Sequence, residues 1–148
     1  WKVGSCMSSI FVDTIRKTGG TLGTDIRVKT TSVYESENST GTTQNLVQSL
    51  TKAWVNHDQA TVNDSFNVGS VTDNGTGDSG HNFTNNMVNI HYVGSGMGVH
   101  DSGSYSTFMS YDHDDPFTTA QATVNQQLVN QNLHDAEPVN TMYAGDLA

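Results

Sequence analysis

Short uncharged side chains dominate this chain and constrain its fold more than any single motif does. Thr, Ser, Asn and Gly together make up about 40% of the 148 residues. As a group they favour turns and strands over helix interiors. Only 14% of the residues are charged, against roughly 25% in an average soluble domain. We therefore expect a β-rich protein suited to an extracellular location or to a multi-subunit shell.

The charge balance argues against nucleic acid and membranes as direct partners. The chain has 15 acidic and 6 basic residues, a formal net charge of -9 and a pI near 4.7. Binding to phosphates requires clustered basic residues. Here they are scattered, at Lys2, Arg16, Lys17, Arg27, Lys29 and Lys52. No run of residues approaches the ~20 apolar residues of a membrane-spanning helix.

The length and the apolar content predict one domain that buries part of its surface against other subunits. A chain of 148 residues is long enough for a single core, so we expect one domain over residues 1–148. The apolar content of 34% is low for a self-sufficient core. A lone Cys6 excludes an internal disulfide framework. It leaves open an intermolecular disulfide, a lipidated Cys after Val3-Gly4-Ser5, or a plain small residue.

Two segments near the N-terminus have strand character. Residues 9–17 are rich in β-branched and aromatic types and lead into the turn signal Thr18-Gly19-Gly20. Residues 25–34 alternate, with Ile26, Val28 and Thr30 on one side. The pattern predicts a hairpin or two neighbouring strands. A short helix over 9–17, ending at the glycine pair, is the alternative.

Two segments have the spacing of amphipathic helices. In residues 43–55 the apolar side chains recur every three or four positions, and Trp54 near the end is expected to anchor the core. In residues 116–133 a similar stripe follows Asp115 and Pro116, a favourable cap and first helical residue. We expect a helix over each segment. Residues 134–148 are expected to form an irregular tail.

Two segments in which apolar and polar residues alternate are predicted to form the centre of the sheet. Residues 87–93 and 106–111 alternate across a Gly-rich connection and are expected to pair as antiparallel strands. In such a hairpin Ile90→Asp would be severely destabilising. The polar stretch 72–86 is expected to be a loop. The fold class is therefore predicted as α+β, with an antiparallel sheet of about five strands and two helices.

Two clusters carry side chains of metal-ligand type. His91 and His113 lie near the acidic run 112–115, a combination that suits zinc. Asp73 and Asp78 flank glycines in the manner of a calcium loop, without the ordered acidic positions and terminal Glu of an EF-hand. Neither spacing matches a recognised site. We therefore predict no catalytic residue, no metal centre and no cofactor, and keep these four residues as weak candidates only.

The features together favour a structural role over catalysis. The chain has no Gly-x-Ser-x-Gly elbow and no phosphate-binding loop. Sparse charge, uncharged polar faces and long polar loops favour a non-enzymatic subunit of a homomeric assembly, such as a virion capsid or tail or an extracellular filament. Its partners would be copies of itself or other subunits. The alternative is a secreted binding module for carbohydrate or a divalent cation, suggested by Trp54, the tyrosines and the acidic Gly-rich loops.

Overall fold

The protein is all-β in the part of the chain described by its computed structural model. The description covers residues 33–35, 43–99, 107–111, 114–115, 117–128, 130 and 132–147. Its ten strands are β1 (Val33–Glu35), β2 (Thr43–Asn45), β3 (Ala53–Asp58), β4 (Thr61–Phe66), β5 (Val68–Gly75), β6 (Asp78–Phe83), β7 (Val93–Gly98), β8 (Thr107–Tyr111), β9 (Gln121–Leu128) and β10 (Val139–Ala144). The expected α+β class is therefore wrong.

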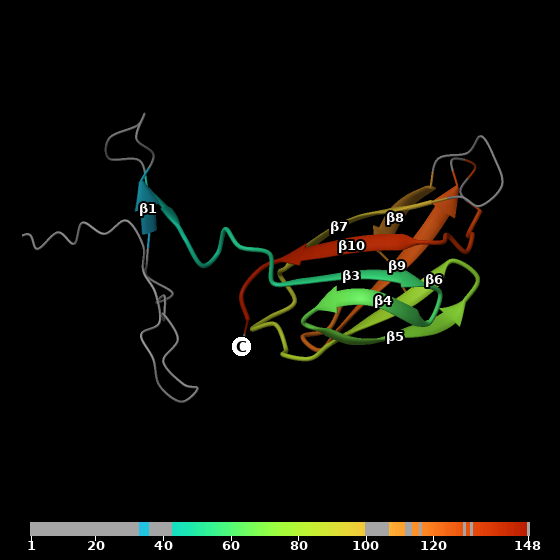
Figure 1. Cartoon of the computed structure of the whole chain (residues 1–148), viewed down its shortest axis with the longest axis horizontal. Helices are drawn as coiled ribbons and strands as arrows, with labels where there is room; N and C mark the ends of the chain where they lie inside the picture. Colours follow the sequence, from blue (N-terminus) through green and yellow to red (C-terminus); the bar gives the residue numbers. More distant parts are fainter. Residues whose placement is uncertain are drawn as a thin grey trace, which may run out of the picture.

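Eight strands form a sandwich of two antiparallel sheets (Figure 1). The first sheet has the order β4-β3-β10-β7, and the second has the order β5-β6-β9-β8. The strands β1 and β2 pair in a separate ribbon that stands clear of the sandwich in Figure 1. Within the described ranges no helix has the length and apolar character needed to span a membrane.

A small aromatic-rich core lies between the two sheets. Alternation along β3 buries Ala53 and Val55, and alternation along β9 buries Ala122 and Val124, as expected when one face of each strand is covered. The ring of Tyr143 packs edge-on against other core aromatics, Phe83 among them at 5.3 Å between centroids. This edge-to-face geometry is the one that aromatic quadrupoles favour.

The helix expected over 43–55 is absent. Residues 43–45 form β2, residues 46–50 form turns, and residues 53–58 form β3, which pairs with β10 and β4. Apolar residues at three- and four-residue spacing also fit a turn followed by a strand. Trp54 correspondingly projects from the face opposite to Ala53 and Val55, so it is no core anchor.

The helix expected over 116–133 is also wrong. Residues 121–128 form β9, which lies between β6 and β8 in the second sheet. The β-branched Thr123 and Val124 favour an extended conformation, and pairing with a strand on each side outweighs the helical spacing of the apolar residues. The tail expected over 134–148 contains β10, which pairs with both β3 and β7.

The expected hairpin of residues 87–93 and 106–111 is wrong. Its first strand is absent over residues 87–92, and its second strand pairs with a different partner. Residues 107–111 do form a strand, β8, but its partner is β9. Residues 87–92 lie outside the strands, and β7 begins only at Val93. Val88 and Ile90 are each 54% exposed. The Gly-rich stretch, expected to be a turn, supplies β7 instead.

The polar stretch expected to be a loop is mostly strand. β5 and β6 pair across a tight turn within residues 72–86. Gly77 in this turn has a φ of 67°, and a Cβ there would come within 2.5 Å of the His134 backbone nitrogen. Only glycine fits such a position. The strands expected at 9–17 and 25–32 fall outside the described residues, as does Cys6, and β1 begins at Val33.

Candidate functional site

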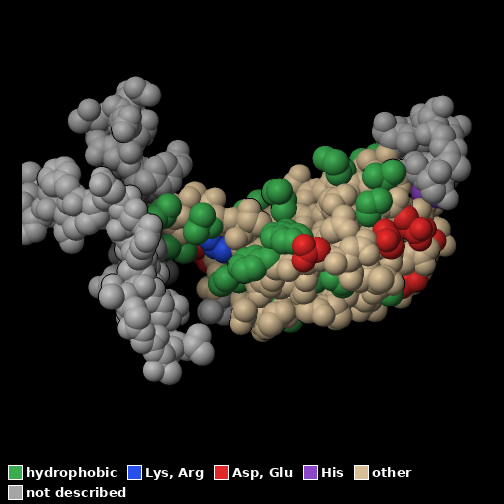
Figure 2. Space-filling model, in the orientation of Figure 1, with side chains coloured by type: hydrophobic (Ala, Val, Ile, Leu, Met, Phe, Trp, Pro, Cys, Tyr) green, Lys and Arg blue, Asp and Glu red, His purple; other side chains and the backbone are tan. Residues whose placement is uncertain are grey.

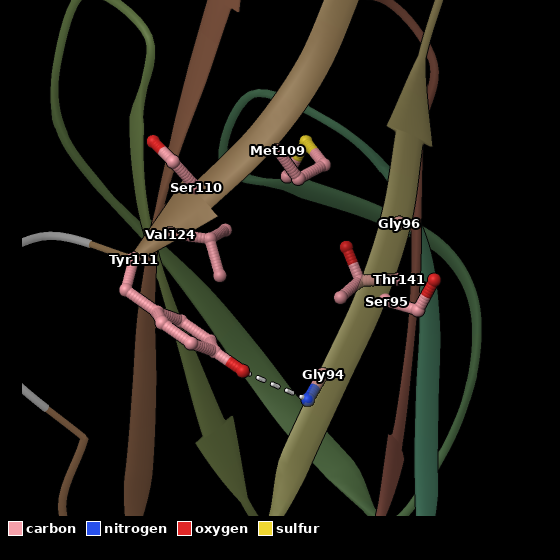
Figure 3. A pocket seen from close by; sticks show the side chains of 8 residues that line it. All are labelled: Gly94, Ser95, Gly96, Met109, Ser110, Tyr111, Val124 and Thr141. Atoms are coloured by element: carbon pink, nitrogen blue, oxygen red, sulfur yellow. Dashed lines mark hydrogen bonds between the residues drawn. The ribbon is translucent and has the colours of Figure 1, made fainter.

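A cleft lies between β7 and β8, the strands at one edge of each sheet (Figure 3). Its volume is about 390 Å³. β7 is hydrogen-bonded to β10 and β8 to β9, and in the described part of the chain neither has a second strand partner. The cleft therefore combines an open space with two strand edges that can accept further hydrogen bonds.

Alternating glycines let β7 lie close to its neighbours along the cleft. Gly94, Gly96 and Gly98 alternate along the strand. A Cβ on Gly96 would lie 3.1 Å from the Met109 Cγ of the opposite sheet, and one on Gly98 would lie 2.5 Å from the Ala136 Cβ. The three glycines therefore lie on the inner face of β7, where any larger residue would collide with neighbouring atoms.

The cleft lining mixes apolar and polar side chains, and two of its hydroxyls, those of Ser110 and Thr141, have no hydrogen-bond partner in the structure. Met109 and Val124 point into the cleft, and the Tyr111 ring spans it (Figure 3). The Gly94 N–H donates to the Tyr111 Oη at 3.4 Å, a long hydrogen bond. Thr141 is 5% exposed, and its Oγ1 has no hydrogen-bond partner in the structure. A buried hydroxyl without a partner costs free energy, so the site favours an occupant that can hydrogen-bond.

Behind this cleft a hydrogen-bonded chain of buried side chains joins the two sheets. His57 lies on β3, His81 on β6 and Tyr143 on β10, and each is at most 1% exposed. The His81 Nδ1 and the Tyr143 Oη are 2.5 Å apart, and the two histidine Nε2 atoms are 3.0 Å apart. The His57 Nδ1 lies 2.7 Å from the Gln59 carbonyl oxygen.

The carbonyl at one end fixes the direction of every proton in this chain. A carbonyl only accepts, so the His57 Nδ1–H donates to Gln59, and the Nε2 of neutral His57 accepts. The His81 Nε2–H then donates to His57, and the Tyr143 hydroxyl donates to the His81 Nδ1. Every donor and acceptor is satisfied while both imidazoles are neutral.

Burial keeps the chain neutral. It lowers the pKa of His81 to about 3, and the adjacent His57 contributes to the same shift. Burial also lowers the pKa of His57, although the Gln59 carbonyl and the Asp58 carboxylate oppose the change. Burial raises the pKa of Tyr143 well above its usual value. The chain is therefore a neutral structural link between the sheets near pH 7.

An exposed apolar row crosses the outer face of the first sheet. Strand register places Phe66 beside Trp54 and Trp54 beside Met142. Phe66 is 51% exposed and Met142 is 54% exposed, and Met97 on β7 is 67% exposed. Figure 2 shows hydrophobic side chains gathered on this face. We call these four residues the apolar face.

A row of amides runs beside the apolar face. The Asn63 Nδ2 donates to the Asn56 Oδ1 at 2.9 Å, and the Asn56 Nδ2 donates to the Asn140 Oδ1 at 2.7 Å. Two acidic side chains border the row: Asp64, which pairs with Asn56, and Asp58, which accepts from the Asn63 Nδ2 at 3.0 Å. The face thus carries apolar and amide groups with little charge.

The weak metal candidates are not brought together. His91 is exposed, and its backbone N–H donates to Asn89. Asp73 accepts from the Gly75 N–H and Asp78 from the Asn74 side chain, so both stabilise the β5–β6 hairpin. His113 lies outside the described residues. No group of three His, Cys, Asp or Glu side chains in the described ranges converges on a possible metal position.

Sequence reasoning missed His57 and His81. The available signal was alternation, because His57 shares the buried face of β3 with Ala53 and Val55. The helix predicted over 43–55 ends two residues before His57 and hides the alternation that continues to it. The contact between the two histidines joins strands of different sheets, so only the packing of the sheets brings them together.

Comparison with known proteins identifies no relative. No family model matches the chain, and no curated protein and no solved structure matches it.

Proposed function

We propose that this protein is a non-enzymatic structural subunit of a homomeric assembly, of the virion or extracellular filament type. The observation that carries the proposal is the apolar face, the row Phe66–Trp54–Met142 with Met97 beside it. A chain with only 34% apolar residues leaves these large side chains in water. Contiguous exposed apolar patches mark interaction sites.

The chemistry of this face is that of a protein–protein interface core. Interface cores are depleted in charge and enriched in aromatic residues and methionine. Trp54, Phe66, Met97 and Met142 supply those types, while the amide row supplies uncharged polar groups. Two copies can pack this face against each other as two sheets pack, about 10 Å apart. Such a two-fold contact must bury roughly 1,000 Å² in total to be stable.

Substitution in the centre of the apolar face tests the proposal. Met142→Lys places a charge between Trp54 on β3 and Met97 on β7 and is expected to shift the protein toward monomer, because a buried unpaired ammonium is costly. Ile90→Lys is the matched control, since Ile90 is also 54% exposed but lies outside the sheets. Both variants add the same charge. Light scattering after size-exclusion chromatography measures the mass of each.

The expected result is a parent protein and an Ile90→Lys variant above the 15.9 kDa monomer mass, with Met142→Lys reduced toward it. A monomeric parent at high micromolar concentration would refute the assembly role. Equal masses for all three proteins above the monomer value would show that the interface lies elsewhere.

Carbohydrate binding is the second candidate, and one specific observation favours it. Trp54 and Phe66 stand side by side with hydrogen-bonding amides on the same sheet face, and such rings and amides can contact a sugar. Glycan binding that is abolished by Trp54→Ala in a monomeric protein would favour this function over assembly.

A further inference from the structure

We infer that the cleft between β7 and β8 receives an extended segment of a second copy, residues 25–30, which adds a strand to the free edge of β7. The inference rests on the proposed assembly function and names the element that links successive subunits. Strand addition to an exposed sheet edge is a general mode of protein recognition, with backbone hydrogen bonds supplying affinity and side-chain pockets supplying specificity.

The backbone of β7 offers the hydrogen bonds. The Val99 N–H donates to Pro138, and the Val99 carbonyl accepts from Glu137, so both groups point toward the β10 side. Because backbone groups alternate along a strand, those of Gly94, Gly96 and Gly98 point to the opposite, open edge. The contact from Gly94 to Tyr111 agrees with this direction. Its length of 3.4 Å makes it a bond that an incoming strand can replace.

The space in the cleft fits the side chains of such a strand. Its volume of about 390 Å³ is between two and three times the ~150 Å³ cavity left by a truncated core residue. Two or three medium side chains therefore fill it. The side chains of Met109 and Val124 favour apolar groups, and the unpaired hydroxyls of Ser110 and Thr141 favour a polar group beside them.

Residues 25–30 carry a matching pattern. Ile26, Val28 and Thr30 alternate on one side, which gives two apolar groups and one hydroxyl. Arg27 and Lys29 occupy the other side and would remain outside the cleft. The same strand that fills the cleft therefore presents two cations along its outer surface.

The charge distribution along the chain favours this occupant. Residues 1–32 contain five basic and two acidic residues, a net charge of +3, whereas residues 33–148 contain one basic and thirteen acidic residues, a net charge of -12. Lys52, the basic residue of the second part, is buried. Exposed Asp114 and Asp115 follow β8, and Asp115 accepts from Thr123, the neighbour of Val124. A basic strand beside this acidic edge is electrostatically favourable.

The position of β1 favours a second copy as the donor. Two residues separate the end of the segment from β1, and Figure 1 shows β1 clear of both sheets, with Val33 57% exposed. The strand that follows the segment therefore lies outside the sandwich of its own chain, which favours a neighbouring molecule as the acceptor.

Disulfide trapping between two chains that carry cysteines at different positions tests the inference. Both carry Cys6→Ser, which removes the native thiol. One chain also carries Met109→Cys, at a β8 position whose side chain points into the cleft, and the other carries Ile26→Cys or Val28→Cys. After mixing and mild oxidation, non-reducing gel electrophoresis should show a dimer for both inward positions. Arg27→Cys is the matched control, expected to give about tenfold less dimer because a shift of one residue turns the side chain to the opposite face.

The outcomes separate the inference from the proposed function. If Arg27→Cys gives as much dimer as Ile26→Cys and Val28→Cys, the segment does not enter the cleft as a strand with alternating faces, and the inference is overturned. No dimer from any position, in a parent protein that light scattering shows to be oligomeric, overturns the inference and leaves the assembly role standing. A disulfide formed only when Val28→Cys and Met109→Cys share one chain overturns the second copy as donor. Circular dichroism and melting temperatures equal to the parent confirm that each variant is folded.

Discussion

At the scale of single residues, the buried chain from Tyr143 through His81 and His57 to Gln59 makes folding sensitive to acid. A second proton on the facing Nε2 atoms would set two N–H donors against each other at 3.0 Å. A proton on either ring also puts a charge in the core, where desolvation opposes it. Neutral imidazoles are therefore a condition of the native packing.

The first prediction follows from the direction of these pKa shifts. The folded-state pKa of His81 is about 3, below the ~6.5 of an unfolded chain. Its stabilisation is therefore complete above pH 6.5 and is lost as the pH falls toward 3. Between about pH 7.5 and pH 5 the contribution of His81 falls by about 2 kcal/mol. Urea unfolding at the two pH values measures the loss.

The control for this prediction is His81→Phe. Removing the imidazole leaves the Tyr143 hydroxyl and the His57 Nε2 unpaired, which costs roughly 1–3 kcal/mol at neutral pH. The variant should nonetheless lose about 2 kcal/mol less than the parent on acidification, because the titrating group is gone. Equal losses in parent and variant would assign the acid sensitivity to carboxylates or to His57.

At the scale of elements, β7 begins only at Val93. The apolar residues just before it are therefore not part of a sheet and contribute little to the stability of the core. The sequence pattern placed Ile90 in a central strand, whereas the structure leaves it 54% exposed before β7. The buried counterpart is Val124 on β9, which is 3% exposed between β6 and β8. A charged side chain should therefore be tolerated at position 90 and should strongly lower the free energy of unfolding at position 124.

The second prediction compares the same substitution at both positions. Ile90→Asp should change the free energy of unfolding by no more than about 0.5 kcal/mol, as exposed substitutions usually do. Val124→Asp should cost more than about 4 kcal/mol or prevent folding, because the carboxylate has no partner in the core. Denaturant titration of both variants tests this, and severe destabilisation by Ile90→Asp would restore the central hairpin.

At the scale of the whole molecule, a sandwich of strongly negative charge is joined to a basic N-terminal segment. Of the six basic residues, five precede β1. Copies of the sandwich repel one another at low salt, and the basic segment of each copy can offset that repulsion. Assembly should therefore depend on salt through the segment and on apolar burial through the apolar face.

The third prediction separates these two contributions. Raising the salt concentration from 0.1 M to 1 M shortens the Debye length from about 10 Å to about 3 Å. The trapped dimer of Val28→Cys with Met109→Cys should fall several-fold over this range. Adding Arg27→Gln and Lys29→Gln should remove most of the dependence on salt. A yield that is independent of salt in both backgrounds would contradict an electrostatic contribution from the segment.

The sequence by itself determined the β-rich and acidic character of the protein and the strand at 107–111, because residue type and local alternation decide those features. It did not determine the helices expected at 43–55 and 116–133, where a helical period and a turn followed by a strand place similar residues at similar positions. Both segments contain strands because β3 pairs with β10 and β9 pairs with β6. The cleft, the apolar face and the contact between His57 and His81 likewise depend on strands distant in sequence. Only tertiary structure decides such pairs, because their stabilisation comes from burial between sheets and leaves no local pattern.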